Sequence, residues 1–164
     1  GLIHAFHLLR TAGCTTHTLV IAGQPGWGCE PLLRLVHDLG LQQEVILTGF
    51  VRGEELPALY RRADLFVFPS WYEGFGLPPL EAMACGVPTI VSNRGALPES
   101  AGDAALTVEP DDTPAMAQAM RAVLEQSDLR NKLIGRGLEH ARRFTWRKAA
   151  ETTEQVYAEA QNRP

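Results

Sequence analysis

Short apolar segments alternate with segments of helical periodicity along most of the chain, and this alternation restricts the possible folds more than any other feature. Five segments have the length and the β-branched or aromatic content of buried strands, at residues 18–23, 44–48, 65–68, 88–92 and 105–108. Apolar residues at helical spacing predict intervening helices at 2–12, 32–39, 56–63 and about 78–85. The alternation predicts an α/β fold in which helices cover both faces of a doubly wound parallel sheet.

The C-terminal part of the chain is predicted to be helical. Thr113 is expected to cap a helix that starts at Pro114, and two more helices are expected at 128–143 and 145–160. No repeat, low-complexity tract or domain boundary is visible within the sequence. With 164 residues, 45% of them hydrophobic, the chain fits a single domain over residues 1–164 that ends in the helix 145–160.

Composition argues against several classes of partner. A net charge of −4 and an isoelectric point near 5.7 disfavour nucleic acid or an anionic membrane, because both bind basic surfaces. No apolar segment is long enough to span a membrane and no signal peptide is visible, so a soluble, cytoplasmic chain is expected. Cys14, Cys29 and Cys85 are expected to be buried reduced thiols, and His4 and His7 have no nearby third ligand for a metal.

The segment from Glu73 to Glu81 carries most of the chemical information. It follows the predicted strand 65–68, contains two glycines, Gly74 and Gly76, and leads into the predicted helix. Without a Cβ, these glycines let the backbone N–H groups approach a ligand, at the end of the helix where the dipole is positive. The segment therefore predicts a binding site for an anion.

The two glutamates refine this prediction, because seven residues separate them across the loop and the start of the helix. A carboxylate repels an anion, so Glu73 and Glu81 are expected to reach past it to hydrogen-bond donors. Sugar hydroxyls are the donors that accompany a diphosphate in a sugar nucleotide. A hydrogen bond to a charged group contributes about 1.5–3 kcal/mol, enough for each glutamate to orient a ligand.

Four loops follow predicted strands directly. In doubly wound sheets, ligands bind beyond the carboxyl ends of the strands. The loops are therefore expected to converge on one crevice, and they comprise Gly23, residues 49–52, residues 70–77 and residues 92–96.

The chain resembles the retaining glycosyltransferases of family 4, also called group 1, which have two facing Rossmann-like lobes in the GT-B fold. The resemblance depends on the Glu73-to-Glu81 string and covers nearly the whole chain. Further matching segments, in the order of the family, are 19–23, 49–51, 56–60, 63–70 and 97–99. All of them match the C-terminal lobe, which in that family holds the sugar-nucleotide donor.

By this resemblance, Glu73 is the catalytic residue and holds hydroxyls of the donor sugar, and Glu81 takes the ribose hydroxyls. The donor would also contact the backbone of Gly74, Phe75, Gly76 and Leu77, with Val51 in the base pocket and Gly23 at the end of the predicted strand 18–23. The implied reaction transfers a hexose, such as mannose or glucose, from a nucleotide diphosphate sugar with retention. No metal or other cofactor is implied, and the acceptor, whether glycan, lipid or small molecule, is not specified.

Part of the family pattern is missing. No Lys or Arg lies between Arg62 and Arg94, and the family supplies an Arg and a Lys just upstream of the helix equivalent to residues 2–12. The sequence starts at Gly1 within that region, so the basic pair, the first strand and the N-terminal acceptor lobe are expected to be absent from it. The first strand of a doubly wound sheet lies at its centre, so a gap is expected there.

Three other functions are compatible with parts of the sequence. A non-catalytic module could bind or sense a nucleotide sugar with the same loop. A dinucleotide-dependent oxidoreductase is disfavoured because no GxGxxG motif is present; the segment 23–28 has another spacing and is broken by Pro25. A glycosidase could use Glu73 and Glu81 as paired carboxylates if they lay near 5 Å apart.

Overall fold

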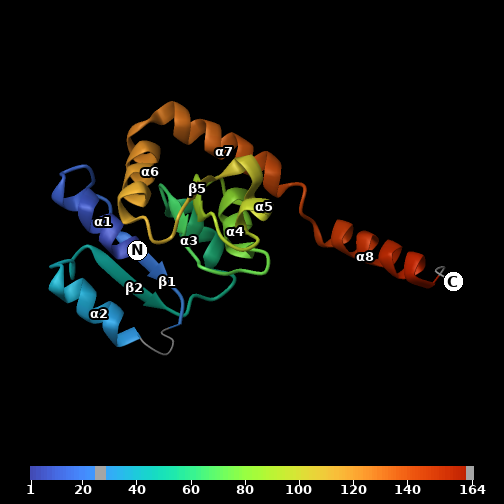
Figure 1. Cartoon of the computed structure of the whole chain (residues 1–164), viewed down its shortest axis with the longest axis horizontal. Coiled ribbons are helices and arrows are strands. Elements are labelled where there is room, and N and C mark those ends of the chain that lie inside the picture. Colours follow the sequence, from blue (N-terminus) through green and yellow to red (C-terminus); the bar gives the residue numbers. More distant parts are fainter. Residues whose placement is uncertain (25–28, 162–164) are drawn as a thin grey trace.

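The structure is a computed structural model that describes residues 1–24 and 29–161 (Figure 1). Strands and helices alternate over its first two thirds, as the sequence predicts. The elements are α1 (Leu2–Thr11), β1 (Leu19–Ala22), α2 (Cys29–Asp38), β2 (Val45–Gly49), α3 (Leu56–Arg62), β3 (Phe66–Phe68), α4 (Leu77–Ala84), β4 (Thr89–Ser92), α5 (Leu97–Ala101), the 3-10 turn η1 (Gly102–Ala104), β5 (Leu106–Val108), α6 (Thr113–Glu125), α7 (Ser127–Ala141) and α8 (Trp146–Gln161).

The structure corrects two local predictions. Helix α5 is not predicted by the sequence, because its five residues are too few to show a helical period. The predicted cap at Thr113 is also wrong, since Thr113 is the first residue of α6. The carboxylate of Asp112 caps this helix by accepting a 2.9 Å hydrogen bond from the N–H of Ala115.

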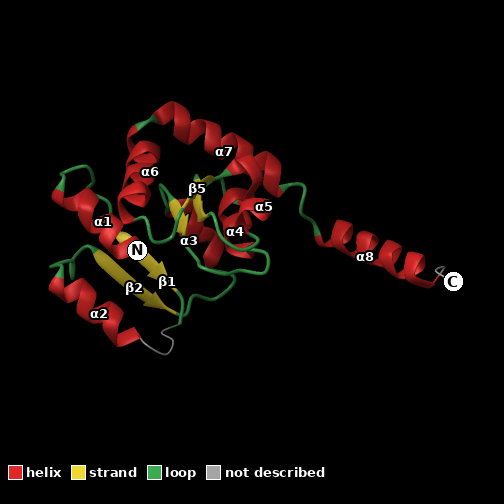
Figure 2. Ribbon diagram, viewed as in Figure 1, coloured by secondary structure: helices red, strands yellow, loops and turns green. Residues whose placement is uncertain are grey.

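All paired strands are parallel, but they form two sheets and not one (Figure 2). One sheet contains β1 and β2, and the other has the order β3-β4-β5. Within the described part of the chain, no strand pairs with the free edge of β1 or with that of β3. The interruption predicted at the centre of the sheet is therefore present, and the neighbouring strands do not close it.

Burial differs between the two sheets. Every residue of β4 is buried, which fits a central strand covered on both faces. In contrast, Val20 of β1 and Ile46 of β2 are register partners that stay 41% and 51% exposed. The prediction that all strands are buried on both faces is therefore wrong for β1 and β2, whose core-facing side carries Leu19 and Ile21.

One hydrophobic core nevertheless joins the two sheets. It combines residues of β2, β4 and β5 with the buried faces of α1 and α6, including Phe6 and Met116. A smaller cluster lies between α4, β4 and α5 and includes Leu80, Met83 and Leu97. Helix α7 covers α4 so closely that a Cβ on Gly137 would lie 3.2 Å from Met83 Cγ. This second cluster holds the start of α4 in place.

The C-terminal helix behaves differently from the rest of the molecule. The predicted helix 145–160 is confirmed as α8, which extends away from the body of the molecule and has no buried residue (Figure 1).

Cys14 and Cys85 are free thiols, as predicted, but they are half-buried and not fully buried. The side chain of Cys29 lies outside the described residues. Among the described helices, none has the length and apolar character to cross a membrane.

Candidate functional site

The loop between β3 and α4 contains Glu73 and the two glycines of the predicted anion site. Gly76 is the N-cap of α4 and has a φ of +96°, a conformation that side chains rarely adopt. A Cβ at this position would also lie 2.6 Å from Leu97 Cδ2 of α5. The backbone turn at residue 76 therefore favours glycine, and a side chain there would also displace the end of the Leu97 side chain.

Four consecutive backbone N–H groups in this loop are unused. Across the described residues, the N–H groups of Gly74, Phe75, Gly76 and Leu77 donate to no protein acceptor. Gly76 is buried, and a buried N–H without an acceptor costs free energy unless water or a ligand takes it. The two residues that follow are prolines without an N–H. The donors for an anion therefore come mainly from the loop, while the helix adds its dipole.

Glu73 is half-buried and is held from two sides. The hydroxyl of Ser70 donates a 2.9 Å hydrogen bond to its Oε1 atom, and its backbone carbonyl accepts a 3.2 Å bond from the N–H of Ala96. Gly95, with a φ of +57°, packs so tightly that a Cβ would lie 3.1 Å from both the N and the O of Glu73. The loop after β4 therefore braces the loop after β3.

Glu81 lies on α4 and is exposed. The hydroxyl of Tyr60 on α3 donates a 3.0 Å hydrogen bond to its Oε2 atom. Burial, together with the negative charge of Glu81 and this hydrogen bond, raises the pKa of Tyr60. In each acid one oxygen thus accepts from a neighbouring hydroxyl, whereas Glu73 Oε2 and Glu81 Oε1 have no partner among the described side chains.

The positive charge around the loop is limited. Arg94, in the loop after β4, lies 6.0 Å from the centre of the Trp71 ring. Its guanidinium is engaged by Glu109, with N–O distances of 3.0 and 2.8 Å. The sequence has no Lys or Arg between Arg62 and Arg94, so within residues 63–93 the positive potential comes from the backbone N–H groups and the helix dipole.

The loops at the carboxyl ends of the strands meet in two pairs. Gly23 donates its N–H to the carbonyl of Gly49 over 3.0 Å, and the Glu73 loop meets the Gly95 loop. In the described residues no hydrogen bond joins these two pairs, so the loops touch within each pair, and the convergence of all four on one crevice stays a prediction. Val51 is half-buried near the first pair.

The side chain of Phe75 packs against another ring, and the side chain of Leu77 is exposed. The Phe75 ring makes an edge-to-face contact with Phe144, with 5.8 Å between ring centres. Leu77 is 49% exposed. These observations are compatible with the expectation that the backbone of both residues, and not the side chain, faces the ligand.

The sequence did not predict the contacts that three residues make at the site: Tyr60, Ser70 and Gly95. Tyr60 lies within the helix predicted at 56–63, and only the packing of α3 on α4 brings its hydroxyl to Glu81. Ser70 offered a weak signal, since it lies three residues before Glu73. Gly95 follows a predicted strand, but its contact with Glu73 is a tertiary one.

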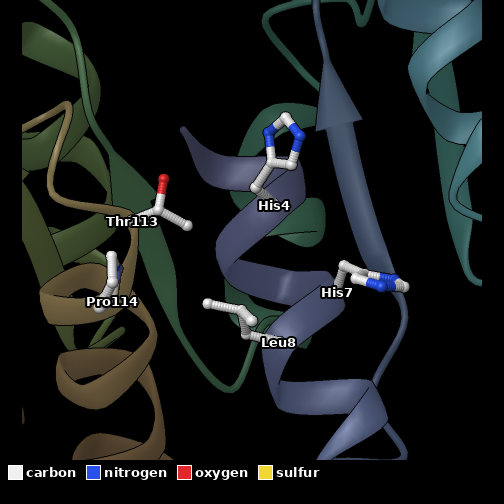
Figure 3. Close-up of a pocket in the computed structure, with 5 residues that line it drawn as sticks. All are labelled: His4, His7, Leu8, Thr113 and Pro114. Carbon is white, nitrogen blue, oxygen red and sulfur yellow. The ribbon is translucent and has the colours of Figure 1, made fainter.

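A cavity of about 430 Å³ lies elsewhere, between α1 and the start of α6, and none of the predicted site residues lines it. Its lining consists of His4, His7, Leu8, Thr113 and Pro114. Figure 3 shows His4 and His7 pointing in different directions, so they do not converge on one point. The Nδ1 atom of His7 is buried and finds no hydrogen-bond partner in the described part of the chain.

Comparison with known proteins identifies the family of this chain. The family model described as "Glycosyl transferases group 1" matches residues 1–140. The chain is 39% identical over 157 residues to the O-antigen chain mannosyltransferase B of Escherichia coli. This match covers 96% of the chain but only 41% of that relative.

Solved structures agree with this assignment. The C-terminal domain of a group 1 family glycosyl transferase from Francisella tularensis aligns with a TM-score of 0.74 and 31% identity, over 85% of this chain and 74% of that one. The Anabaena protein HepE, solved in complex with UDP, aligns with a TM-score of 0.83 over 96% of this chain and 44% of that one; at 22% identity this supports the fold. The fold is that of one lobe of a GT-B glycosyltransferase, interrupted at the centre of its sheet. The chain therefore belongs to the group 1 glycosyl transferases.

Proposed function

We propose that this chain is the donor-binding part of a hexosyltransferase and that the loop from Glu73 to Glu81 binds a nucleotide diphosphate sugar. The four unused N–H groups of residues 74–77 are the observation that carries this proposal. They form a compact donor set next to the positive end of α4, which suits a diphosphate. The oxygens of Glu73 and Glu81 that have no protein partner would accept from sugar and ribose hydroxyls respectively.

The named relatives support a choice of sugar. The E. coli relative is a mannosyltransferase, so mannose is the first donor sugar to test, while the UDP in HepE makes a uridine nucleotide the alternative. In the proposed reaction, the bond between the anomeric carbon and the diphosphate oxygen breaks and a new bond to an acceptor oxygen forms with retention. The nucleoside diphosphate leaves and takes up the proton that the acceptor hydroxyl loses. Val51 and Gly23 would contact the nucleoside.

A titration followed by NMR tests donor binding. GDP-mannose and UDP-glucose are added to the 15N-labelled chain, and the amide signals of residues 74–77 are expected to shift for at least one of them. Glu73→Gln and Glu81→Gln should each weaken binding by about tenfold to a hundredfold, because each loses a charge-assisted hydrogen bond. Glu154→Gln on the exposed α8 is the matched control. The proposal is wrong if neither donor shifts any signal between residues 73 and 81.

The proposal also requires no metal. Backbone N–H groups and the helix dipole would neutralise part of the diphosphate charge, so addition of EDTA is expected to leave the donor affinity unchanged. A loss of affinity that Mg²⁺ or Mn²⁺ restores would contradict this expectation.

One observation favours a second candidate, a module that binds a nucleotide sugar without turning it over. The guanidinium of Arg94, in the loop after β4, is engaged by Glu109. Residues 63–93 contain no Lys or Arg, so residues 63–94 offer the diphosphate no free cation. Donor binding without transfer in a longer protein that also carries the basic pair and the acceptor lobe, measured with a range of acceptors, would favour this module over the transferase.

A further inference from the structure

We propose that Tyr60 is a positioning residue for Glu81: its hydroxyl holds one carboxylate oxygen so that the other faces the ribose of a bound nucleotide. The inference rests on the proposed function of Glu81 and adds a residue outside the Glu73-to-Glu81 string. Its basis is the 3.0 Å hydrogen bond between the Tyr60 hydroxyl on α3 and Glu81 Oε2 on α4.

The position of the hydroxyl is set by packing and not by the ligand. The Tyr60 ring meets Phe66 of β3 edge to face, with 5.4 Å between ring centres and an angle of 81°. Phe66 in turn stacks on Phe68 of the same strand, 5.9 Å away. An aromatic side chain has two rotatable bonds, and these contacts restrict both. The hydroxyl therefore provides a fixed point on the sheet side of Glu81.

The direction of the hydrogen bond is also determined. An ionised glutamate only accepts hydrogen bonds, so the tyrosine must donate. Burial raises the pKa of Tyr60, and the neighbouring charge of Glu81 acts in the same direction, so the phenol keeps its proton throughout the neutral range. Tyr60 can therefore donate to Glu81 throughout the neutral range.

The hydrogen bond from Tyr60 restricts the side chain of Glu81 before a ligand binds. Glu81 is exposed, and a free glutamate side chain loses much rotamer freedom when a ligand immobilises it. With Oε2 held by Tyr60, part of this freedom is already lost, and Oε1 remains available for the ribose. The effect of Tyr60 should therefore depend on the ribose hydroxyls and be transmitted only through Glu81.

The test compares nucleotides with and without these hydroxyls. Tyr60→Phe keeps the ring contacts and removes only the donor. NMR titration of the chain with UDP, GDP or ADP, whichever the unchanged chain binds, should give an affinity about threefold to tenfold weaker in the variant. For the 2′,3′-dideoxy form of the same nucleotide, the two affinities should be equal. In the Glu81→Ala background, Tyr60→Phe should cause no further loss.

Tyr157→Phe on α8 is the matched control, because Tyr157 is 66% exposed and the helix has no buried residue. Equal binding of ribose nucleotides by Tyr60→Phe and the unchanged chain would overturn the role of Tyr60 while leaving the proposed function intact. So would an equal loss for ribose and dideoxy nucleotides, which would indicate a general disturbance of α4. No binding of any nucleotide by the unchanged chain would instead refute the proposed function itself.

Discussion

At the scale of single residues, Ser70 is the clearest test of how Glu73 is held. Its hydroxyl donates to Glu73 Oε1 over 2.9 Å, and Ser70→Ala removes this bond from a half-buried acid. We expect donor affinity to fall about threefold to tenfold for the nucleotide sugar but not for the nucleoside diphosphate alone, because Glu73 is proposed to hold the sugar. Calorimetric titration with both ligands measures the difference, with Ser127→Ala on the exposed start of α7 as control. Equal losses for both ligands would contradict this role.

At the scale of elements, the start of α4 depends on Gly76 and on its contact with α5. Gly76→Ala would force a side chain into a φ of +96° and place its Cβ 2.6 Å from Leu97 Cδ2. We expect the free energy of unfolding to fall by about 1–3 kcal/mol, from the strained backbone alone. Urea denaturation measures it, and Gly40→Ala is the matched control, since Gly40 also has a positive φ, of +68°, but nothing lies within 4 Å of a Cβ there. A similar effect of both substitutions would show that the contact with α5 does not matter.

At the scale of the whole molecule, the division into two sheets predicts unequal local stability. The sheet of β1 and β2 has two strands and an exposed face with Val20 and Ile46, whereas β4 is buried and has a partner on each side. A two-stranded sheet is marginally stable by itself, so its amides should open more readily. Hydrogen exchange followed by mass spectrometry should show faster exchange in β1 and β2 than in β4. Equal protection of both sheets would mean that the shared core makes the molecule open as one unit.

Much of the fold could be predicted because its signals are local. The strand at 65–68 and the helix that follows it are recognised from apolar runs, prolines and glycines that are neighbours in sequence. Helix α5 escaped prediction because it is too short for a period. The exposure of Val20 also escaped, since an apolar strand residue does not reveal which faces of the sheet are covered.

The candidate site, like the fold, combines features that depend on local sequence with features that depend on packing. By itself the sequence determined the order of strands and helices, the glycine turn before α4, and the two acids that flank it, because these depend on residues close together in the chain. Only the tertiary structure decided that Tyr60 reaches Glu81, that Gly95 braces Glu73, and that the neighbouring strands do not close the gap in the sheet. Such contacts join residues that are distant in sequence, and they exist only because packing brings separate elements within a few ångströms of each other.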